Sequence, residues 1–172
     1  SDGAMYVGNG WAEIEGQWYY YADGSGAVKT GWAKVGGKWY YLRPGSGVMA
    51  TGWQSVDGTW YYLGDSGAMR TGWLSIGGKW YYLKGSGAMA EGWQRVGGAW
   101  YYLNPGSGVM ATGWKQVDGA WYCLSKSGPM LKGWQKVGGS WYYLKGSGAM
   151  ATGWQKVDGA WYYPVSYTHL TL

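Results

Sequence analysis

The sequence predicts an all-β protein, a repeat solenoid of about eight stacked β-hairpins joined by Gly-rich connectors. Three observations predict this fold class. A Gly-Trp pair recurs every 20 or 21 residues, a second Trp follows seven positions after each of these Trp residues, and a Gly-containing pair lies midway between the two. A period of this length is typical of architectures in which each copy buries its apolar surface against its neighbours.

Residues 31–42, GWAKVGGKWYYL, illustrate the predicted hairpin. The central Gly-Gly pair supplies the positive φ angles of a two-residue type I′ turn, which pairs Trp32 with Tyr41 and Lys34 with Trp39. Because side chains alternate across a strand, these four lie on one face, and the alanine, valine, first tyrosine and leucine of the unit lie on the other. A lone hairpin is marginally stable in water, so successive copies must pack together.

Connectors rich in Gly and Ser join the hairpins and usually end in Met. The longer units place their extra residue here, where Pro44 and Pro105 stiffen two of the connectors, as suits a surface loop. Val28 takes the place of the methionine in the first connector. The turn pair of the first hairpin is Glu15-Gly16, and Glu is a poorer choice for positive φ than Gly or Asp, so we expect this hairpin to be the loosest.

The composition excludes several function classes. The 172 residues include 16 Trp, 18 Tyr and 35 Gly but no Phe, so aromatic rings must supply most of the buried apolar area. The net charge of +5 is spread without runs, which argues against a nucleic-acid partner. With Cys123 and His169 each alone of its kind, we expect no catalytic residue, metal site, cofactor or internal disulfide. No segment is apolar enough for membrane insertion.

The repeat pattern covers residues 1–163, and the start SDGAM matches the late part of a unit, so we interpret the chain as a fragment that begins mid-repeat. Residues 164–172, PVSYTHLTL, leave the pattern and are interpreted as a tail of non-native origin. His169 lies in this tail, and we expect no function for it.

Stacking in sequence order would bring two tryptophans of one hairpin together with the first tyrosine of the next. Trp32, Trp39 and Tyr61 would then converge, and Met49 from the connector would form a fourth wall. Such an aromatic box suits an organic cation held by cation–π contacts and offers no acid, base or nucleophile. The alternative, that these aromatic side chains form only a core, stays open.

The unit GWxxVxGxWYYLxxxGxMxTGW resembles the choline-binding, or cell-wall-binding, repeat of surface proteins and cell-wall hydrolases of Gram-positive bacteria. The resemblance covers residues 1–163 and implies a non-catalytic module that binds choline groups of teichoic or lipoteichoic acid at the extracellular cell surface. Carried onto this chain, it implies up to seven choline boxes. They are Trp11, Trp18 and Tyr40; Trp32, Trp39, Tyr61 and Met49; Trp53, Trp60, Tyr81 and Met69; Trp73, Trp80, Tyr101 and Met89; Trp93, Trp100, Tyr122 and Met110; Trp114, Trp121, Tyr142 and Met130; and Trp134, Trp141, Tyr162 and Met150.

The chain departs from the pattern at a few positions. Val28 would remove the methionine wall of the first box. Cys123 replaces the second tyrosine of its WYY and should weaken the packing of one wall without abolishing a site. Pro129 stands where other copies have Ala or Val. Trp154 and Trp161 have no following hairpin and should form no complete box.

Two other functions compete with choline binding. Related repeats in glucan-binding proteins and clostridial toxins resemble this unit in period and in the Gly-Trp start, which makes a carbohydrate-binding module the main alternative. In those repeats the second Trp is usually replaced, whereas every copy here keeps it. The other alternative is a structural spacer. The sequence leaves self-association, the source organism and any catalytic domain ahead of residue 1 open.

Overall fold

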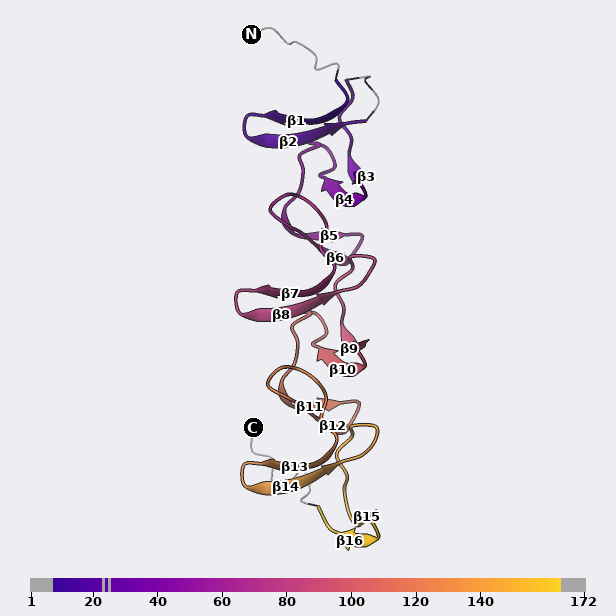
Figure 1. Cartoon of the computed structure of the whole chain (residues 1–172). Coiled ribbons are helices and arrows are strands. Elements are labelled where there is room, and N and C mark those ends of the chain that lie inside the picture. The colour runs from indigo at the N-terminus through magenta and orange to yellow at the C-terminus, as the bar shows by residue number, and fades with distance from the viewer. Residues whose placement is uncertain (1–7, 23, 25, 165–172) are drawn as a thin grey trace. The chain divides into compact units, whose positions relative to one another are not determined.

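The computed structural model describes residues 8–22, 24 and 26–164. In this part of the chain, consecutive strands pair into eight antiparallel hairpins, each a separate two-stranded sheet, and no helix forms (Figure 1). The predicted all-β hairpin repeat is confirmed. The hairpins are β1 (Gly10–Ile14) with β2 (Gln17–Tyr21), β3 (Gly31–Val35) with β4 (Lys38–Leu42), β5 (Gly52–Val56) with β6 (Thr59–Leu63), β7 (Gly72–Ile76) with β8 (Lys79–Leu83), β9 (Gly92–Val96) with β10 (Ala99–Leu103), β11 (Gly113–Val117) with β12 (Ala120–Leu124), β13 (Gly133–Val137) with β14 (Ser140–Leu144), and β15 (Gln155–Val157) with β16 (Ala160–Tyr162).

The strand register matches the sequence prediction. In the β3–β4 hairpin, Trp32 lies opposite Tyr41, and Lys34 lies opposite Trp39. The ring centroids of Trp32 and Tyr41 are 5.0 Å apart, as expected for side chains that share one face. Alternation along the strands therefore fixes which aromatic rings each hairpin presents to its neighbour.

Backbone angles at the turns explain why the Gly-Gly and Asp-Gly pairs recur. Gly36 and Gly37 adopt φ values of 55° and 80°, and Asp57 adopts 49°, all in the left-handed region that a type I′ turn requires. Glu15 adopts φ 52° in the first hairpin, a conformation that costs more for Glu than for Gly. The expectation that this hairpin is the loosest stays a prediction.

The end of each connector returns to the stack as a short bridging segment. Met49 forms an isolated β-bridge with Leu42 of its own hairpin. The amide of Met49 donates a 2.7 Å hydrogen bond to the carbonyl of Trp18 in the preceding hairpin, and the next amide, that of Ala50, donates one of 2.8 Å to Tyr41. Consecutive amides of the connector thus tie two hairpins together through the main chain.

Leucine and alanine side chains that recur once per repeat are among the most deeply buried residues of each unit. The leucine that ends the second strand of a hairpin is at most 2% exposed in six copies, and an alanine that follows the connector methionine is fully buried in three. The leucines are Leu42, Leu63, Leu83, Leu103, Leu124 and Leu144, and the alanines are Ala50, Ala90 and Ala151. Each leucine contributes roughly 2 kcal/mol by burial, so these side chains stabilise the hairpins of each unit, while the outer tryptophans stay half exposed.

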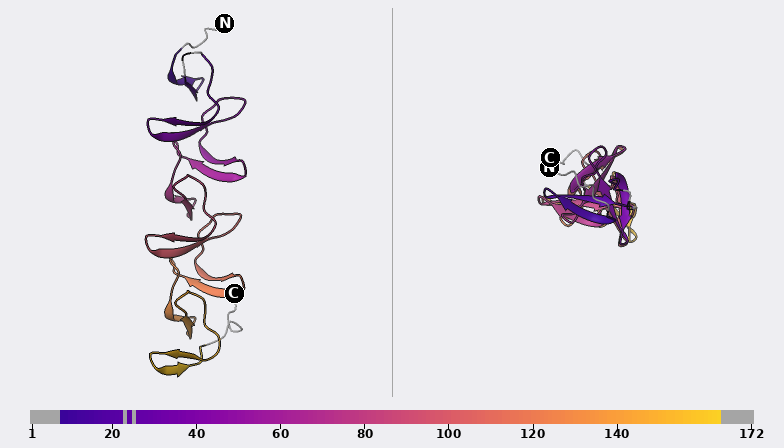
Figure 2. Two further views of the ribbon diagram at one scale, coloured as in Figure 1. Left: turned by 90° about the vertical axis from the view of Figure 1, so that its right-hand side faces the viewer. Right: turned by 90° about the horizontal axis from the view of Figure 1, so that it is seen from above.

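Contacts divide the chain into two compact units. One comprises the described residues up to Ser75 together with Tyr82–Met89, and the other comprises Ile76–Tyr81 together with the described residues from Ala90 on. Within the second unit, successive hairpins point in different directions, and β15–β16 returns to the same side as β9–β10 (Figures 1 and 2). Neighbouring hairpins of a unit therefore present their aromatic faces toward different sides.

Two sequence predictions fall largely outside the described residues. The mid-repeat start lies in residues 1–7, and the off-pattern tail with His169 lies, apart from Pro164, in residues 165–172. The domain boundary between residues 163 and 164 stays a prediction.

Candidate aromatic boxes

The second aromatic box shows the arrangement most fully. Five side chains surround a cavity of about 240 Å³, namely Trp32, Trp39, Tyr61, Met69 and Ser86. The rings of Trp32 and Trp39 are nearly perpendicular, at 89°, with centroids 6.4 Å apart, and Trp32 lies 4.8 Å from Tyr61. The structure thus brings together the two tryptophans and the tyrosine that the sequence predicted for this box.

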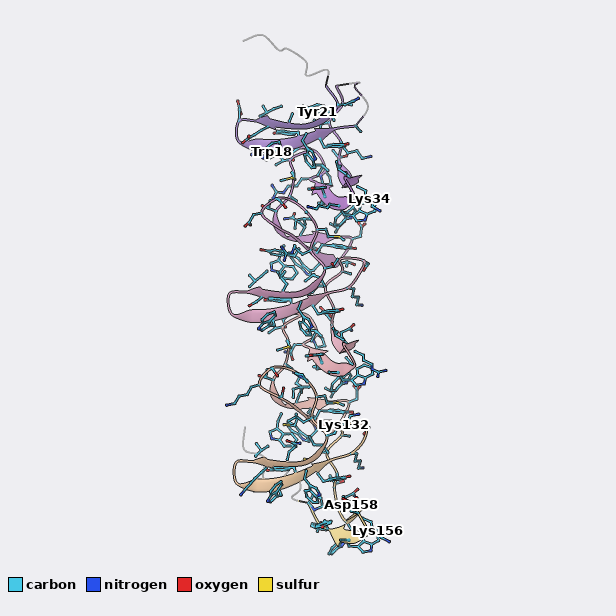
Figure 3. All side chains as sticks on the ribbon, in the orientation of Figure 1. Trp18, Tyr21, Lys34, Lys132, Lys156 and Asp158 are labelled. Carbon is cyan, nitrogen blue, oxygen red and sulfur yellow. The ribbon has the colours of Figure 1, made fainter. Side chains whose placement is uncertain are left out.

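The hairpin itself holds the two tryptophans at right angles. Trp32 in β3 and Trp39 in β4 come from opposite strands but from the same face, and Tyr41 supports the ring of Trp32 from that face. Trp39 stands at the outer edge with 41% of its surface exposed. The ammonium of Lys34, labelled in Figure 3, lies 5.8 Å from the centroid of the Trp39 ring, where a cation–π contact steadies the outer wall.

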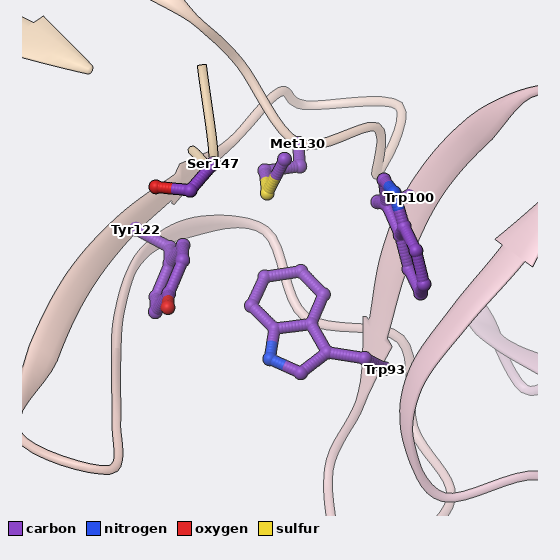
Figure 4. Close-up of a pocket in the computed structure, with 5 residues that line it drawn as sticks. All are labelled: Trp93, Trp100, Tyr122, Met130 and Ser147. Atoms are coloured by element: carbon purple, nitrogen blue, oxygen red, sulfur yellow. The ribbon is translucent and has the colours of Figure 1, made fainter. Parts of the chain in front are cut away.

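A second copy of the arrangement lies in the other unit. Trp93, Trp100, Tyr122 and Met130 surround a cavity of about 240 Å³, and Ser147 lies beside Met130 (Figure 4). The Trp93 centroid is 6.5 Å from that of Trp100 and 4.8 Å from that of Tyr122. The same distances recur in both units because the same residues occupy the same positions of the hairpin.

The first box is larger than the other two cavities and carries an acidic side chain. Its cavity measures about 330 Å³, and the rings of Trp11 and Tyr40 lie 4.8 Å apart. The lining residues are Trp11, Trp18, Tyr40, Met49, Asp65 and Ser66.

The structure places the connector methionines one box earlier in the chain than the sequence predicted. Met49 was predicted for the box of Trp32, but it lines the first box, and Met69 lines the second. The same shift places Met130 with Trp93, where Met110 was predicted. The prediction that Val28 leaves the first box without a methionine is therefore wrong.

The cause of the shift is the hydrogen bond from each methionine amide to the outer tryptophan of the preceding hairpin. This bond recurs at 2.7 to 2.8 Å in every pair that the structure describes: Met49 with Trp18, Met69 with Trp39, Met89 with Trp60, Met110 with Trp80, Met130 with Trp100, and Met150 with Trp121. A methionine thus joins the box whose tyrosine comes from its own hairpin.

Sequence reasoning missed a contribution from a third repeat. A Cβ atom added to Gly67 would overlap the Met49 sulfur, and one added to Gly87 would overlap that of Met69, so these glycines form the backing of the methionine wall. Their φ values are 77° and 86°. The serine before each such glycine lines the cavity, as Ser86 does in the second box. The Ser-Gly pair in every connector was the signal that could have revealed this role.

The sixth set of residues is packed more tightly than the others. Trp114 lies 4.9 Å from Tyr142, and Tyr142 and Met150 are only 3% and 6% exposed within a cluster that includes Cys123. Trp121 packs against this cluster and is partly buried. The equivalent tryptophans of six other hairpins are more exposed, at 39 to 52%: Trp18, Trp39, Trp60, Trp80, Trp100 and Trp141. Met130 and Met150, predicted for the sixth and seventh boxes, thus lie one box earlier.

Cys123 fits the prediction of a small buried hydrophobe, since it is 5% exposed. Burial raises the pKa of its thiol. In six other hairpins the tyrosine at this position lies 5.0 to 5.2 Å from the first tryptophan, as Tyr41 does from Trp32. The indole Nε1 of Trp114, which lacks such a tyrosine, is buried without a hydrogen-bond partner among the described residues.

The seventh set is open. Trp134 lies 6.4 Å from Trp141 and 5.1 Å from Tyr162, but these last two side chains are 52% and 43% exposed. The tryptophans of the last hairpin, Trp154 and Trp161, are more than 60% exposed.

The third and fourth boxes stay predictions, because their members belong to both units. Trp53 and Trp60 lie 6.4 Å apart in the first unit, which also contains Met89. Their predicted partner Tyr81 belongs to the second unit, as do Trp80 and Tyr101, the predicted partners of Trp73.

The chemistry available to the boxes is binding. Indole and phenol faces attract cations through the negative face of the ring, and a thioether sulfur adds a polarisable contact. Within residues 8–164, apart from residues 23 and 25, no three His, Cys, Asp or Glu side chains gather as metal ligands would. In the same residues, no helix has the length and apolar character needed to cross a membrane.

Comparison with known proteins places these boxes in a family. The choline-binding repeat matches residues 8–52, 50–91, 70–112, 90–132 and 111–152, and a cell wall binding repeat matches 152–163. The chain therefore belongs to the choline-binding repeat family, and it is a module of the choline-binding and cell-wall-binding class. No curated protein matches it.

Solved structures agree with the family. The chain is 44% identical to CbpJ from Streptococcus pneumoniae TIGR4, with a TM-score of 0.84, and 44% identical to choline binding protein F from Streptococcus pneumoniae, with a TM-score of 0.80. Both matches cover 94% of this chain, and they cover 57% and 56% of those proteins, so the chain spans little more than half their length. The pneumococcal cell wall endolysin from phage Cp-1 is 36% identical over 71% of this chain and 37% of its own, with a TM-score of 0.52.

Proposed function

We propose that this chain anchors a protein to choline-bearing teichoic or lipoteichoic acid on a Gram-positive cell surface, through aromatic boxes between successive hairpins. The observation that carries the proposal is the cavity of about 240 Å³ walled by Trp32, Trp39, Tyr61 and Met69. The module itself contributes binding and no catalysis. The phage Cp-1 endolysin was solved with choline, and choline binding protein F with a peptidoglycan analogue, which supports this class of ligand.

The size and lining of the cavity suit a trimethylammonium group. Cavities of about 300 to 1,000 Å³ take drug-sized ligands, so this smaller space favours a compact head group. The perpendicular rings of Trp32 and Trp39 form two walls of the cavity, and Tyr61 and Met69 complete it. Each cation–π contact is worth about 0.5 to 2 kcal/mol, which after the cost of association corresponds to an affinity on the order of millimolar for one box.

Several weak boxes on one chain make an anchor. A teichoic acid repeats the same cation along its length, so contacts after the first become intramolecular and avidity can exceed single-site affinity by about 100-fold or more. This requires choline groups within reach of two boxes at once. A binding module with this behaviour would hold an attached domain at the wall while releasing it in the presence of free choline.

Retention on a resin that carries trimethylammonium groups tests the proposal. The net charge of +5 disfavours adsorption to a cationic resin by ion exchange, so retention must come from the boxes. We expect saturating choline to elute the protein and moderate salt to elute little of it, because ring faces bind the cation. Failure to bind this resin, together with retention on dextran that glucose oligomers reverse, would favour the carbohydrate-binding alternative.

A further inference from the structure

Of the side chains that line the three cavities, those of the first box alone include a charged group. Asp65, an exposed residue of the connector after β6, lines its cavity next to Ser66. Glycine precedes the corresponding serine in the other two cavities, Gly85 before Ser86 and Gly146 before Ser147, so neither has a side chain there. Among these three boxes, the carboxylate is the only acidic side chain that lines a cavity.

We infer that Asp65 strengthens the binding of an organic cation in the first box and makes the affinity of that box fall as the ionic strength rises. The inference rests on the proposed function and extends it to the choice among boxes. A carboxylate at the rim adds Coulomb attraction to the cation–π contacts of Trp11, Trp18 and Tyr40. Because Asp65 is exposed, water and salt weaken this attraction, and the expected gain in affinity is about two- to fivefold.

The cavity of the first box is also larger than those of the second and fifth, which affects how closely a cation contacts its rings. At about 330 Å³ it leaves more room than the 240 Å³ of the second and fifth boxes, so a trimethylammonium group does not fill it as closely. Looser contact with the rings would by itself weaken binding, since dispersion and cation–π energies fall with distance. The carboxylate offsets that loss, and its effect should therefore be visible when it is removed.

The equivalent position of the second box allows the charge to be added instead. Gly85 does not have a positive φ, and a Cβ atom built there would meet no atom within 4 Å. Gly85→Asp should therefore fold normally and give the second box the same rim carboxylate. Gly85→Asn supplies a side chain of the same shape without the charge, and Asp65→Asn removes the charge from the first box in the same way.

Indole N–H signals of the full chain, followed by NMR during titration with choline chloride, report each box separately through Trp11 and Trp32. We expect Asp65→Asn to weaken the first box about two- to fivefold at low salt and leave the second unchanged. Gly85→Asp should strengthen the second box by a similar factor, and Gly85→Asn should not. Both effects should shrink at about 0.5 M salt, where the Debye length is only a few ångströms.

The outcomes separate this inference from the proposed function. If choline shifts the indole signals of both boxes but neither charge change alters an affinity, the role of Asp65 is wrong and choline binding stands. An effect of Gly85→Asn equal to that of Gly85→Asp would likewise refute a role for charge. If choline shifts no indole signal in any box, the proposed function is wrong, and this inference falls with it.

Discussion

The backbone amide of Met69 donates a 2.7 Å hydrogen bond to the carbonyl oxygen of Trp39. One wall of the second box is thereby fixed to another, although the two residues belong to different hairpins. Because main-chain atoms make the bond, the wall side chains can change without removing the connection. Substitutions in the boxes should therefore alter ligand binding more than folding.

Met69→Ala should weaken choline binding in the second box about two- to tenfold, because it removes the sulfur contact and leaves the backbone bond intact. The indole signal of Trp32 during a choline titration measures this affinity. Met49→Ala is the matched control, since the structure assigns Met49 to the first box. If Met49→Ala weakened the second box instead, the position of the connectors would be wrong.

The walls that could be predicted from sequence are those set by alternation along a strand. The turn pairs fix the register, the register puts Trp32 and Trp39 on one face, and sequential stacking brings Tyr61 to them. Each step uses local geometry that a repeat of fixed length reveals. For this reason the two tryptophans and the tyrosine were assigned to the box in which the structure places them.

The methionine could not be assigned in this way, because its place depends on a bond between distant residues. The amide of Met49 could point toward either neighbouring hairpin, and only the contact with Trp18, far back in the chain, decides between them. The tighter packing of the sixth set likewise depends on how Trp121 and Tyr142 pack around the smaller Cys123. Tertiary packing of this kind leaves no local pattern.

Gly87→Ala should disturb the second box although it lies outside the cavity. An added Cβ atom would overlap the Met69 sulfur, and the φ of 86° disfavours any side chain, so the methionine must move into the space for the ligand. We expect at least a severalfold loss of choline affinity at Trp32 and some loss of stability. Gly85→Ala, in the same connector with open space around it, should change neither. Equal effects of the two substitutions would contradict this reasoning.

Trp100→Ala and Leu103→Ala should separate binding from stability within one strand. Trp100 is 39% exposed and lines the fifth box, whereas Leu103 is fully buried. We expect the first substitution to abolish binding in that box with little change in the urea midpoint, and the second to cost about 2 to 5 kcal/mol of unfolding free energy. Loss of all choline binding by folded Trp100→Ala protein would refute independent boxes.

The thiol of Cys123 should react slowly in the native protein. Its raised pKa comes from burial, so the native thiol stays protonated at a pH where the thiol of the unfolded chain begins to ionise. Alkylation by iodoacetamide near pH 8.5 should therefore be much slower in buffer than in urea. For the same reason, the unfolding free energy should fall as the pH rises above the pKa of the unfolded thiol, and Cys123→Ala should remove this component of the fall. Equal alkylation rates in buffer and in urea would show that the thiol is accessible.

Cys123→Tyr should open the sixth box and add a choline site. A tyrosine here would restore the ring that lies against the first tryptophan in other hairpins, as Tyr41 does against Trp32, and would displace the packing around Tyr142 and Met150. Trp121 would then stand at the outer edge, as Trp100 does, and leave a cavity between the rings. Calorimetric titration with choline should count one more site than in the parent chain, and the indole signal of Trp114 should begin to respond. Cys123→Ser, which adds no ring, is the control and should leave the count unchanged. An unchanged count for folded Cys123→Tyr protein, or a Trp114 signal that already responds to choline in the parent chain, would show that the cysteine does not close this box.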